Sequence, residues 1–480
     1  MSSKGYRLVG FLIILLTLFC ALLYSFRSNI TDHDYRASYH AVYTTTVTGR
    51  KAAFVKGFVA TEIDGSFDGS TLQSLCSSRE WTPGLIFKCD APMGGVAIVR
   101  NVFLNCVRFA IEAGATSFIV PEIRGPGDYP LPFEHLFDLE HFTHSLNTSC
   151  PQMKIMPQVN ELWKHPSTAN PLVLDTSALS TKFVEGVIGS PWEWHAAFHK
   201  HLNETHPRKF DANKPVLVVL QRPLLQFPLS YDDPHLVANF GKLLKFKTEV
   251  RNLAGAVLYA MDEDYELGID AEKNGVRLGQ FYGAHLRTTS DAIAAGWTPY
   301  EIQATNYLSH ANRTKLNIIY VVSGNGLDVK TLAETAGNMS ITVTSRDMLL
   351  SKRGFEKERE DLQAMTWEQR LLVDYEVLLR SAAFGGTHES SLAWNIAMRR
   401  HVVIGHGSWT EVGGEGVKVR SIQQFKKDQR SMQESSRRKM PTTEAPTGSG
   451  RIFEQSFSDQ LSVVFGPLSE GRMFQLSMWP

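Results

Sequence analysis

Short apolar runs alternate with helical patterns in the first third of the chain. The run Leu85–Phe87 predicts a strand, and apolar side chains then recur at helical spacing between residues 102 and 111. Gly114 suits the end of that helix, and the run Phe118–Val120 predicts the next strand. A strand, a loop, a helix and a second strand in this order form the unit from which parallel sheets are built.

The second half of the chain repeats this alternation. Helical spacing occurs in residues 233–260, after Val329 and in residues 367–383. Apolar and β-branched runs predict strands at residues 216–220, 281–286, 318–322, 342–344 and 402–404. The pattern therefore predicts an α/β protein with two doubly wound, Rossmann-type domains, at residues 51–232 and 233–425.

One apolar run near the start is long enough to cross a membrane. Residues 8–24 are almost entirely apolar, with basic residues on both sides. The alternative is a cleaved signal peptide, but the run exceeds the usual h-region of roughly 7–15 residues and no small-residue cleavage site follows it. We therefore expect a cytoplasmic tail and signal anchor at residues 1–27, a stem at 28–50, and a single-pass type II protein of the Golgi or endoplasmic reticulum membrane with its remaining chain in the lumen.

Glycosylation motifs and cysteines fit that compartment. N-x-S/T sequons begin at five asparagines, which are Asn29, Asn147, Asn203, Asn312 and Asn338. Four cysteines lie outside the apolar run, and an even number suits two disulfides in an oxidising compartment. Three pairings are possible, and buried free thiols are the alternative. Locality alone favours Cys76–Cys89 with Cys106–Cys150.

The balance of charge excludes one class of partner. Lys+Arg and Asp+Glu both number 49, so the formal net charge is zero, whereas a nucleic-acid binder carries a clear basic excess. Residues 426–450 are first basic and then rich in proline and threonine, which predicts an exposed flexible loop. Residues 451–480 return to apolar character, and we expect them to pack back on the body of the protein.

Three segments at the starts of predicted helices carry residues that suit an anion. The first covers residues 94–101, where Gly94 and Gly95 precede a helix. Two glycines let a ligand approach the backbone closely, and the first turn of a helix offers it free N–H groups. An ordinary turn explains the same residues equally well.

The second segment covers residues 281–291 at the end of a predicted strand. His285 and Arg287 project to the same side of that strand, because side chains alternate along it. An arginine at such a position grips a diphosphate with two charge-assisted hydrogen bonds and stabilises the charge of a departing phosphate. A structural ion pair is the alternative.

The third segment, residues 384–394, is predicted to be a loop between two helices. Its hydroxyl groups, on Thr387, Ser390 and Ser391, suit phosphate oxygens, and they also suit simple helix capping.

The order and spacing of these segments resemble the GDP-fucose O-fucosyltransferase superfamily, which includes plant enzymes and the protein O-fucosyltransferases. The early G-G-x-x-x-x-R loop of that family is matched by Gly94, Gly95 and Arg100. Its F-D-x-x-H-F stretch resembles residues 135–142, and its third motif resembles residues 384–391. Its H-x-R motif is matched by His285 and Arg287, with Asp291 four residues later. The resemblance covers roughly residues 85–150 and 280–405 and is strongest to fungal-type members.

This resemblance implies a GT-B-like fold, in which two Rossmann-type domains face each other across a cleft. It also implies an inverting transfer of fucose from GDP-fucose to a protein or glycan hydroxyl, without a metal ion or another cofactor. Arg287 is then the expected catalytic residue, acting on the β-phosphate. The donor-binding residues expected from the resemblance are Gly94, Gly95, Arg100, His285, Arg287, Asp291, Thr387, Ser390 and Ser391.

Two positions depart from the family pattern. Ala97 stands where the first loop often has asparagine, and Met93 stands where some members have a catalytic glutamate. No catalytic base is therefore carried over, and Glu122 and Asp291 are candidates by chemistry alone. The departure at Ala97 keeps two alternatives open: a transferase for another sugar nucleotide such as GDP-mannose, and a non-catalytic homologue that binds glycans or proteins. Protein Ser/Thr, an N-glycan core and a wall polysaccharide all remain possible acceptors.

Overall fold

The computed structural model describes most of the chain after residue 48. The described residues are 49–92, 94–125, 127–157, 162, 165–179, 183–184, 187–206, 210–221, 223, 226–404, 455–468 and 470–480. The expected membrane anchor at residues 8–24, most of the stem and the basic loop at 426–450 lie outside them. No helix within the described ranges is both long and apolar enough to cross a bilayer. Residues 56–480 form one compact unit, so the predicted boundary at residue 232 stays a prediction.

Five parallel strands form the first sheet of this unit. They lie in the order β5-β2-β1-β9-β6, with bounds Lys154–Met156, Ala115–Ile119, Thr82–Cys89, Val216–Gln221 and Leu172–Asp175. The strands predicted at residues 85–87, 118–120 and 216–220 are confirmed. Helix α4 (Val96–Glu112) joins β1 to β2 and begins earlier than its apolar pattern indicates, with Gly95 as its N-cap. Nearly every residue of α4 is buried, which places it at the centre of the unit.

The second sheet has six strands in the order β12-β11-β10-β13-β15-β14. Their bounds are Thr342–Thr344, Ile318–Val322, Tyr282–His285, Ala383–Thr387, Ser462–Phe465 and Gln455–Ser458. All neighbours are parallel except β14, which pairs antiparallel with β15 at the edge. The predicted α/β class, with two largely parallel sheets, is therefore confirmed.

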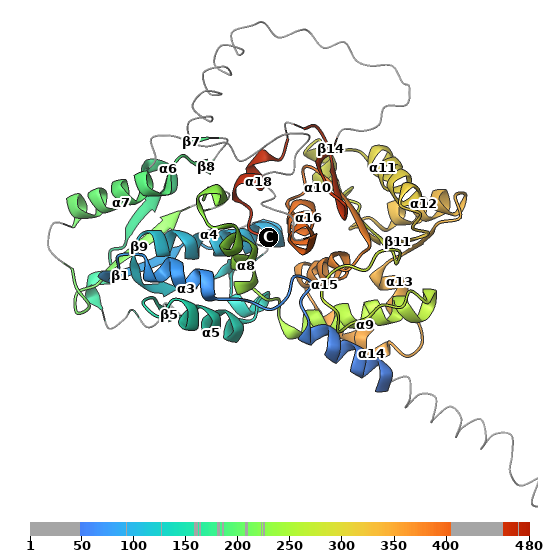
Figure 1. Ribbon diagram of the computed structural model, residues 1–480, viewed down its shortest axis with the longest axis horizontal. Coiled ribbons are helices and arrows are strands. Elements are labelled where there is room, and N and C mark those ends of the chain that lie inside the picture. Colours follow the sequence, from blue (N-terminus) through green and yellow to red (C-terminus); the bar gives the residue numbers. More distant parts are fainter. Residues whose placement is uncertain are drawn as a thin grey trace, which may run out of the picture. The chain divides into compact units, whose positions relative to one another are not determined.

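Helices connect and cover the strands of both sheets. In the first half they are α3 (Ser70–Ser77), α5 (Leu139–Ser149), α6 (Thr176–Leu179) and α7 (Pro191–Thr205). In the second half they are α8 (Pro234–Phe240), α9 (Thr248–Tyr265), α10 (Ser290–Ala294), α11 (Tyr300–Arg313), α12 (Gly326–Gly337), α13 (Arg346–Leu350), α14 (Glu356–Ala364), α15 (Trp367–Leu379), α16 (Ser391–Ile404) and α18 (Arg472–Ser477). Helix α4 packs against α15 and α16, so helices from both halves meet at the centre of Figure 1.

Three of the predicted elements were wrong. The run at residues 402–404 is the last turn of α16 and not a strand. Strand β13 covers Ala383–Thr387 at the middle of the second sheet, although residues 384–387 were expected in a loop. The helix predicted at residues 233–260 is interrupted after α8 by a 3-10 turn at Gly241–Leu243, and Gly241 there lies against the last residues of the sequence. A Cβ atom added at Gly241 would lie 1.7 Å from the backbone oxygen of Pro480, so a continuous helix with a larger residue does not fit there.

The packing of two glycines explains why β13 is a strand. A Cβ atom on Gly385 would lie 2.0 Å from the hydroxyl oxygen of Tyr282, and one on Gly386 would lie 2.4 Å from the Cβ atom of Ala393. Glycine therefore lets the neighbouring strand and the following helix approach closely. Glycine pairs also mark turns, and for this reason the sequence pattern alone favours a loop.

The chain after residue 454 completes both the sheet and the centre of the unit. Strands β14 and β15 extend the second sheet, while the side chains of Met478 and Trp479 are fully buried. The indole N–H of Trp479 donates to Asn105 Oδ1 at 2.8 Å, and the backbone N–H of the same residue donates to Asn101 Oδ1 at 2.9 Å. These residues thus pack back on the protein as the apolar pattern indicates.

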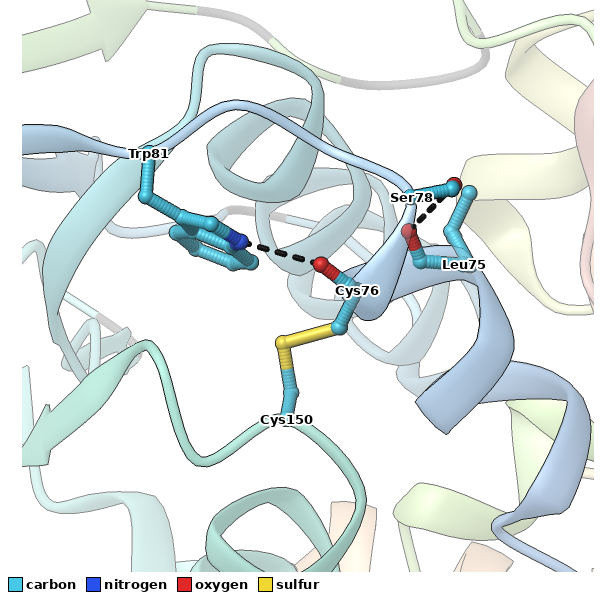
Figure 2. The surroundings of a disulfide bond; sticks show 5 residues. All are labelled: Leu75, Cys76, Ser78, Trp81 and Cys150. Atoms are coloured by element: carbon cyan, nitrogen blue, oxygen red, sulfur yellow. Dashed lines mark hydrogen bonds between the residues drawn. A yellow bond between two sulfur atoms is a disulfide. The ribbon is translucent and has the colours of Figure 1, made fainter.

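The two disulfides differ from the pairing favoured by locality. Cys76 bonds to Cys150, and Cys89 bonds to Cys106. Figure 2 shows the first of them, next to a hydrogen bond of 2.9 Å from the indole N–H of Trp81 to the carbonyl oxygen of Cys76. The prediction failed because folding brings α3 beside the end of α5, and α4 back along β1.

Peptide mapping tests this pairing directly. Digestion of the unreduced protein is expected to release one cross-linked peptide pair that contains Cys76 and Cys150 and another that contains Cys89 and Cys106. The physical reason is the distance between the paired Cα atoms, which is 5.5 Å for Cys76 and Cys150 and 6.0 Å for Cys89 and Cys106. Both distances are within the range that a disulfide spans. A cross-link between Cys76 and Cys89 would contradict the described fold of the first half.

Candidate active site

Two of the three segments singled out by sequence meet at the same edge of the second sheet. His285 ends β10 and Thr387 ends β13, and these two strands are parallel neighbours. From β10 the chain continues to β11 and β12 on one side, whereas β13 lies on the other side. The carboxyl edge between β10 and β13 is therefore the topological switch point of the sheet, where open α/β sheets bind their ligands.

His285 is a buried, neutral member of this edge. Its side chain is buried, and its Nδ1 lies 3.2 Å from the hydroxyl oxygen of Ser390. The hydroxyl of Tyr307 donates to the carbonyl oxygen of His285 at 2.8 Å. Burial, and then the nearby charge of Arg287, lowers the pKa of His285 to about 3. At physiological pH the imidazole can therefore orient a ligand by a hydrogen bond but brings it no charge.

Arg287 supplies the positive charge of the site. Its backbone N–H donates to the Oε1 atom of Gln303, and the Nε2 of that side chain donates back to the carbonyl oxygen of Arg287, both at 3.0 Å. The Arg287 side chain is 29% exposed, and its guanidinium group is hydrogen bonded to Thr289 and Asp291. It also lies 5.6 Å from the ring centroid of Trp297. The backbone is thus fixed while the charged group faces solvent, as an anion-binding arginine requires.

Asp291 holds this arginine in place. The side-chain hydrogen bond from Thr289, followed by the charge of Arg287, lowers the pKa of the Asp291 carboxyl. An ionised carboxylate paired with an arginine is a poor proton acceptor. Asp291 is therefore better suited to positioning Arg287 than to acting as the catalytic base.

Glu389 connects the two segments, and the sequence analysis gave it no role. Its Oε1 atom accepts hydrogen bonds from the backbone N–H and the hydroxyl of Thr298, both at 2.7 Å, and its Oε2 atom accepts one from Thr387. Burial acts to raise the pKa of Glu389, but the hydrogen bonds from Thr387 and Thr298 outweigh it and leave the pKa below its ordinary value. Gln303 in turn donates to the carbonyl oxygen of Thr298 at 2.6 Å. One network therefore joins the backbone of Arg287 to the end of β13.

The first segment lies at the start of α4. Gly94 has a φ of +123°, a conformation that favours glycine, and Gly95 caps the helix. Ala97 is buried, as is Arg100 one turn later.

The guanidinium of Arg100 binds the backbone of this same chain. It donates to the carbonyl oxygens of Trp479 and Gly241, both at 2.8 Å, and to the backbone oxygen of Pro480. The carbonyl oxygen of Trp479 also accepts from Asn395 of α16 at 2.8 Å. Because of its burial, the pKa of Arg100 is lowered to about 10. As described, Arg100 ties α4 to α16 through the end of the chain, and its expected contact with the donor stays a prediction.

Comparison with known protein families shows to which family the chain belongs. Residues 85–403, well over half of the chain, match the sequence profile of the family described as GDP-fucose protein O-fucosyltransferase. The chain belongs to that family. It is therefore a member of a family of glycosyltransferases that use GDP-fucose.

Solved structures give distant likenesses. The crystal structure of POFUT1 in complex with GDP-fucose is 14% identical, with a TM-score of 0.40, and the match covers 66% of this chain and 94% of that one. The structure of fucosyltransferase NodZ from Bradyrhizobium is 12% identical, with a TM-score of 0.34, and the match covers 67% of this chain and 92% of that one. No curated protein sequence matches the chain.

The motif positions of the family contain no catalytic base in this O-fucosyltransferase homologue. Met93 lies outside the described residues, and Ala97 carries no polar group. Glu122 is exposed just before the two-residue strand β3 (Ile123–Arg124) of the first half. Its role as a proton acceptor stays a prediction from chemistry alone.

The buried imidazole of His285 makes stability depend on pH. The unfolded chain takes up a proton on this group below its ordinary pKa of 6.5, but the folded chain does not do so until about pH 3. The contribution of the neutral His285 to the free energy of unfolding is therefore fully present above pH 6.5. It is lost progressively as the pH falls from 6.5 to about 3. In urea titrations between pH 6.5 and 4.5, His285→Gln is expected to reduce the pH slope of the unfolding free energy by up to about 1.4 kcal/mol per pH unit. Equal slopes for the two proteins would show that His285 is protonated in the folded state.

Proposed function

We propose that this chain transfers fucose from GDP-fucose to a hydroxyl group of a protein or glycan, with inversion at the anomeric carbon and without a metal ion. Membership of the O-fucosyltransferase family supports the donor and the reaction class. The observation that carries the proposal is the arrangement at the switch point of the second sheet. There, His285 at the end of β10 contacts Ser390, the residue before helix α16, and Arg287 follows two residues after His285 with its side chain partly exposed.

These groups suit a nucleotide diphosphate as a leaving group. When the bond from the fucose anomeric carbon to the β-phosphate oxygen breaks, negative charge builds up on that phosphate. Arg287 is placed to stabilise it with charge-assisted hydrogen bonds, exchanging its Asp291 partner for phosphate oxygens. The hydroxyls of Thr387, Ser390 and Ser391, with the free N–H groups of α16, are suited to the remaining oxygens.

We further propose that the reaction takes place in the lumen of the secretory pathway, with the chain anchored through residues 8–24. Two disulfides support an oxidising compartment. The four sequon asparagines among the described residues, Asn147, Asn203, Asn312 and Asn338, are all exposed. Glycosidase treatment of the protein from its native cell should lower its apparent mass, and an unchanged mass would count against this location.

A non-catalytic homologue is the second candidate, and one observation favours it. Arg100, the arginine of the family's first motif, spends its described hydrogen bonds on the backbone of the chain itself. A site that has lost its first-motif contacts can keep the fold without the chemistry.

A thermal-shift titration of the full chain with GDP, GDP-fucose, GDP-mannose and UDP-sugars separates these functions. A ligand that binds only the folded state stabilises it by about 2.7 kcal/mol at 100 times its dissociation constant. Shifts with GDP and GDP-fucose but not with UDP-sugars support the proposal, and a larger shift with GDP-mannose indicates the other donor. The absence of a shift with every nucleotide favours the non-catalytic homologue.

A further inference from the structure

A cavity of about 410 Å³ adjoins the third motif. It is lined by His388 and Glu389 from the turn after β13 and by residues 470–474, which form the loop before α18 and the start of that helix. Gly471 has a φ of +77°, and a Cβ atom added to it would lie 2.0 Å from the indole of Trp394, so this wall packs tightly. The ring of Phe474 stacks on the same indole, with centroids 5.9 Å apart. This wall of the cavity is therefore packed against the buried indole of Trp394.

His388 is held rigidly at the edge of this cavity. Its backbone N–H donates to the carbonyl oxygen of Phe465 at 2.9 Å, and its own carbonyl oxygen accepts from the indole N–H of Trp394 at 2.8 Å. Its Nδ1 atom is buried and lies 3.1 Å from the Oε2 atom of Glu389, within hydrogen-bond distance but off the hydrogen-bond axis. The side chain as a whole is 17% exposed and lines the cavity.

We propose that this cavity receives the acceptor hydroxyl and that His388 takes its proton, an inference that rests on the proposed function. In the step, the acceptor oxygen forms a bond to the anomeric carbon of fucose, and the bond from that carbon to the β-phosphate oxygen breaks. The hydroxyl proton moves to the free ring nitrogen of His388, and GDP leaves with the electron pair of the broken bond. The carboxylate of Glu389 stabilises the imidazolium that forms, as the third group of a nucleophile–base–carboxylate arrangement does.

Among the titratable side chains at the ends of β10 and β13, His388 is best placed for the task. Both oxygens of Glu389 accept hydrogen bonds from threonines, so this carboxylate orients its neighbours and is occupied. Asp291 is occupied by Arg287. His285 is buried, and its Nδ1 faces the hydroxyl of Ser390.

The same carboxylate ties the proposed base to the proposed donor site. Glu389 binds Thr298, Thr298 binds Gln303, and Gln303 holds both backbone polar groups of Arg287. Donor phosphate and acceptor hydroxyl are therefore positioned by one hydrogen-bond network. Fixing two reactants in this way contributes to catalysis by removing the entropy of bringing them together.

GDP release from GDP-fucose, with water as the acceptor, tests the proposal on the purified full chain. His388→Ala is expected to lower the turnover by about 10²–10⁴-fold, the usual contribution of a general base, while GDP affinity stays unchanged. Added imidazole is expected to restore part of the lost turnover, an effect that a purely structural role would not produce. His235→Ala, an exposed histidine on α8, is the matched control and should turn over like the unaltered chain.

Each other outcome has a defined meaning. If His388→Ala retains full turnover, or if its loss of turnover is not restored by imidazole although GDP binds normally, His388 is not the base. If the unaltered chain binds GDP but releases none from GDP-fucose, the proposed function itself is contradicted, and this inference falls with it. His388→Gln, which keeps the size of the side chain, separates loss of the base from a local collapse of the cavity.

Discussion

Arg287→Ala is expected to lower kcat/KM for GDP-fucose by about 10²–10³-fold or more, the usual effect of removing a group that stabilises transition-state charge. The guanidinium is the positively charged group that the described structure presents at the switch point between β10 and β13, and its partners Thr289 and Asp291 hold it toward solvent. Loss of the side chain leaves Asp291 ionised there, and this carboxylate then repels the diphosphate. The measurement is steady-state GDP release from GDP-fucose.

Two further variants make this result specific. Arg287→Lys keeps the charge but loses the two-pronged geometry, and it is expected to give an intermediate rate. Arg353→Ala removes an exposed arginine from the turn before α14 and should leave the rate unchanged. All three proteins should melt within a few degrees of one another, because the Arg287 side chain packs at the surface. Full turnover by Arg287→Ala would remove this residue from the mechanism.

Trp479→Ala is expected to lower the free energy of unfolding by about 4 kcal/mol, in the range measured for buried aromatic residues. The indole is fully buried, lies 4.4 Å from the ring of Phe240 and donates a hydrogen bond to Asn105. Its removal leaves a cavity at the point where α4 meets the end of the chain. Equilibrium unfolding in guanidinium chloride gives the difference directly.

Trp192 provides a matched control for this experiment. It is 58% exposed on α7, so Trp192→Ala is expected to change the unfolding free energy by less than about 0.5 kcal/mol. Equal destabilisation by the two substitutions would show that the burial of Trp479 in the described structure is wrong.

The sequence predicted those elements that depend on local pattern. The strand at residues 318–322 is exact, because five apolar, mostly β-branched residues are buried on both faces of a parallel sheet. The predicted strand at 281–286 brackets β10, and the motif residues at its end lie at the carboxyl edge of the second sheet. Periodicity and motif spacing depend on residues that are close in sequence, so they predict these elements without knowledge of the tertiary contacts.

Features that depend on tertiary contact escaped prediction. Strand β13 carries two glycines because Tyr282 and Ala393 approach it closely. The sequence of residues 384–387 does not indicate which distant residues will pack against it. The disulfide pairing depends on which helices fold side by side. Glu389 stands between Thr387 and Ser390 in the sequence, but its partner Thr298 lies 91 residues away.

The position of β15 in the second sheet also orders the events of protein synthesis. Strand β13 pairs with β10 on one side but cannot acquire its second neighbour, β15, until residues 462–465 have been made. Arg100 and Asn101 likewise receive several of their hydrogen-bond partners from residues 477–480. A nascent chain can therefore complete the first sheet early, while its second sheet still lacks two of six strands and α4 lacks some of its hydrogen-bond partners. Such an intermediate exposes strand edges and apolar surface. A chain cut short after residue 404 would therefore keep one edge of β13 unpaired, and such an edge can pair with another chain and aggregate.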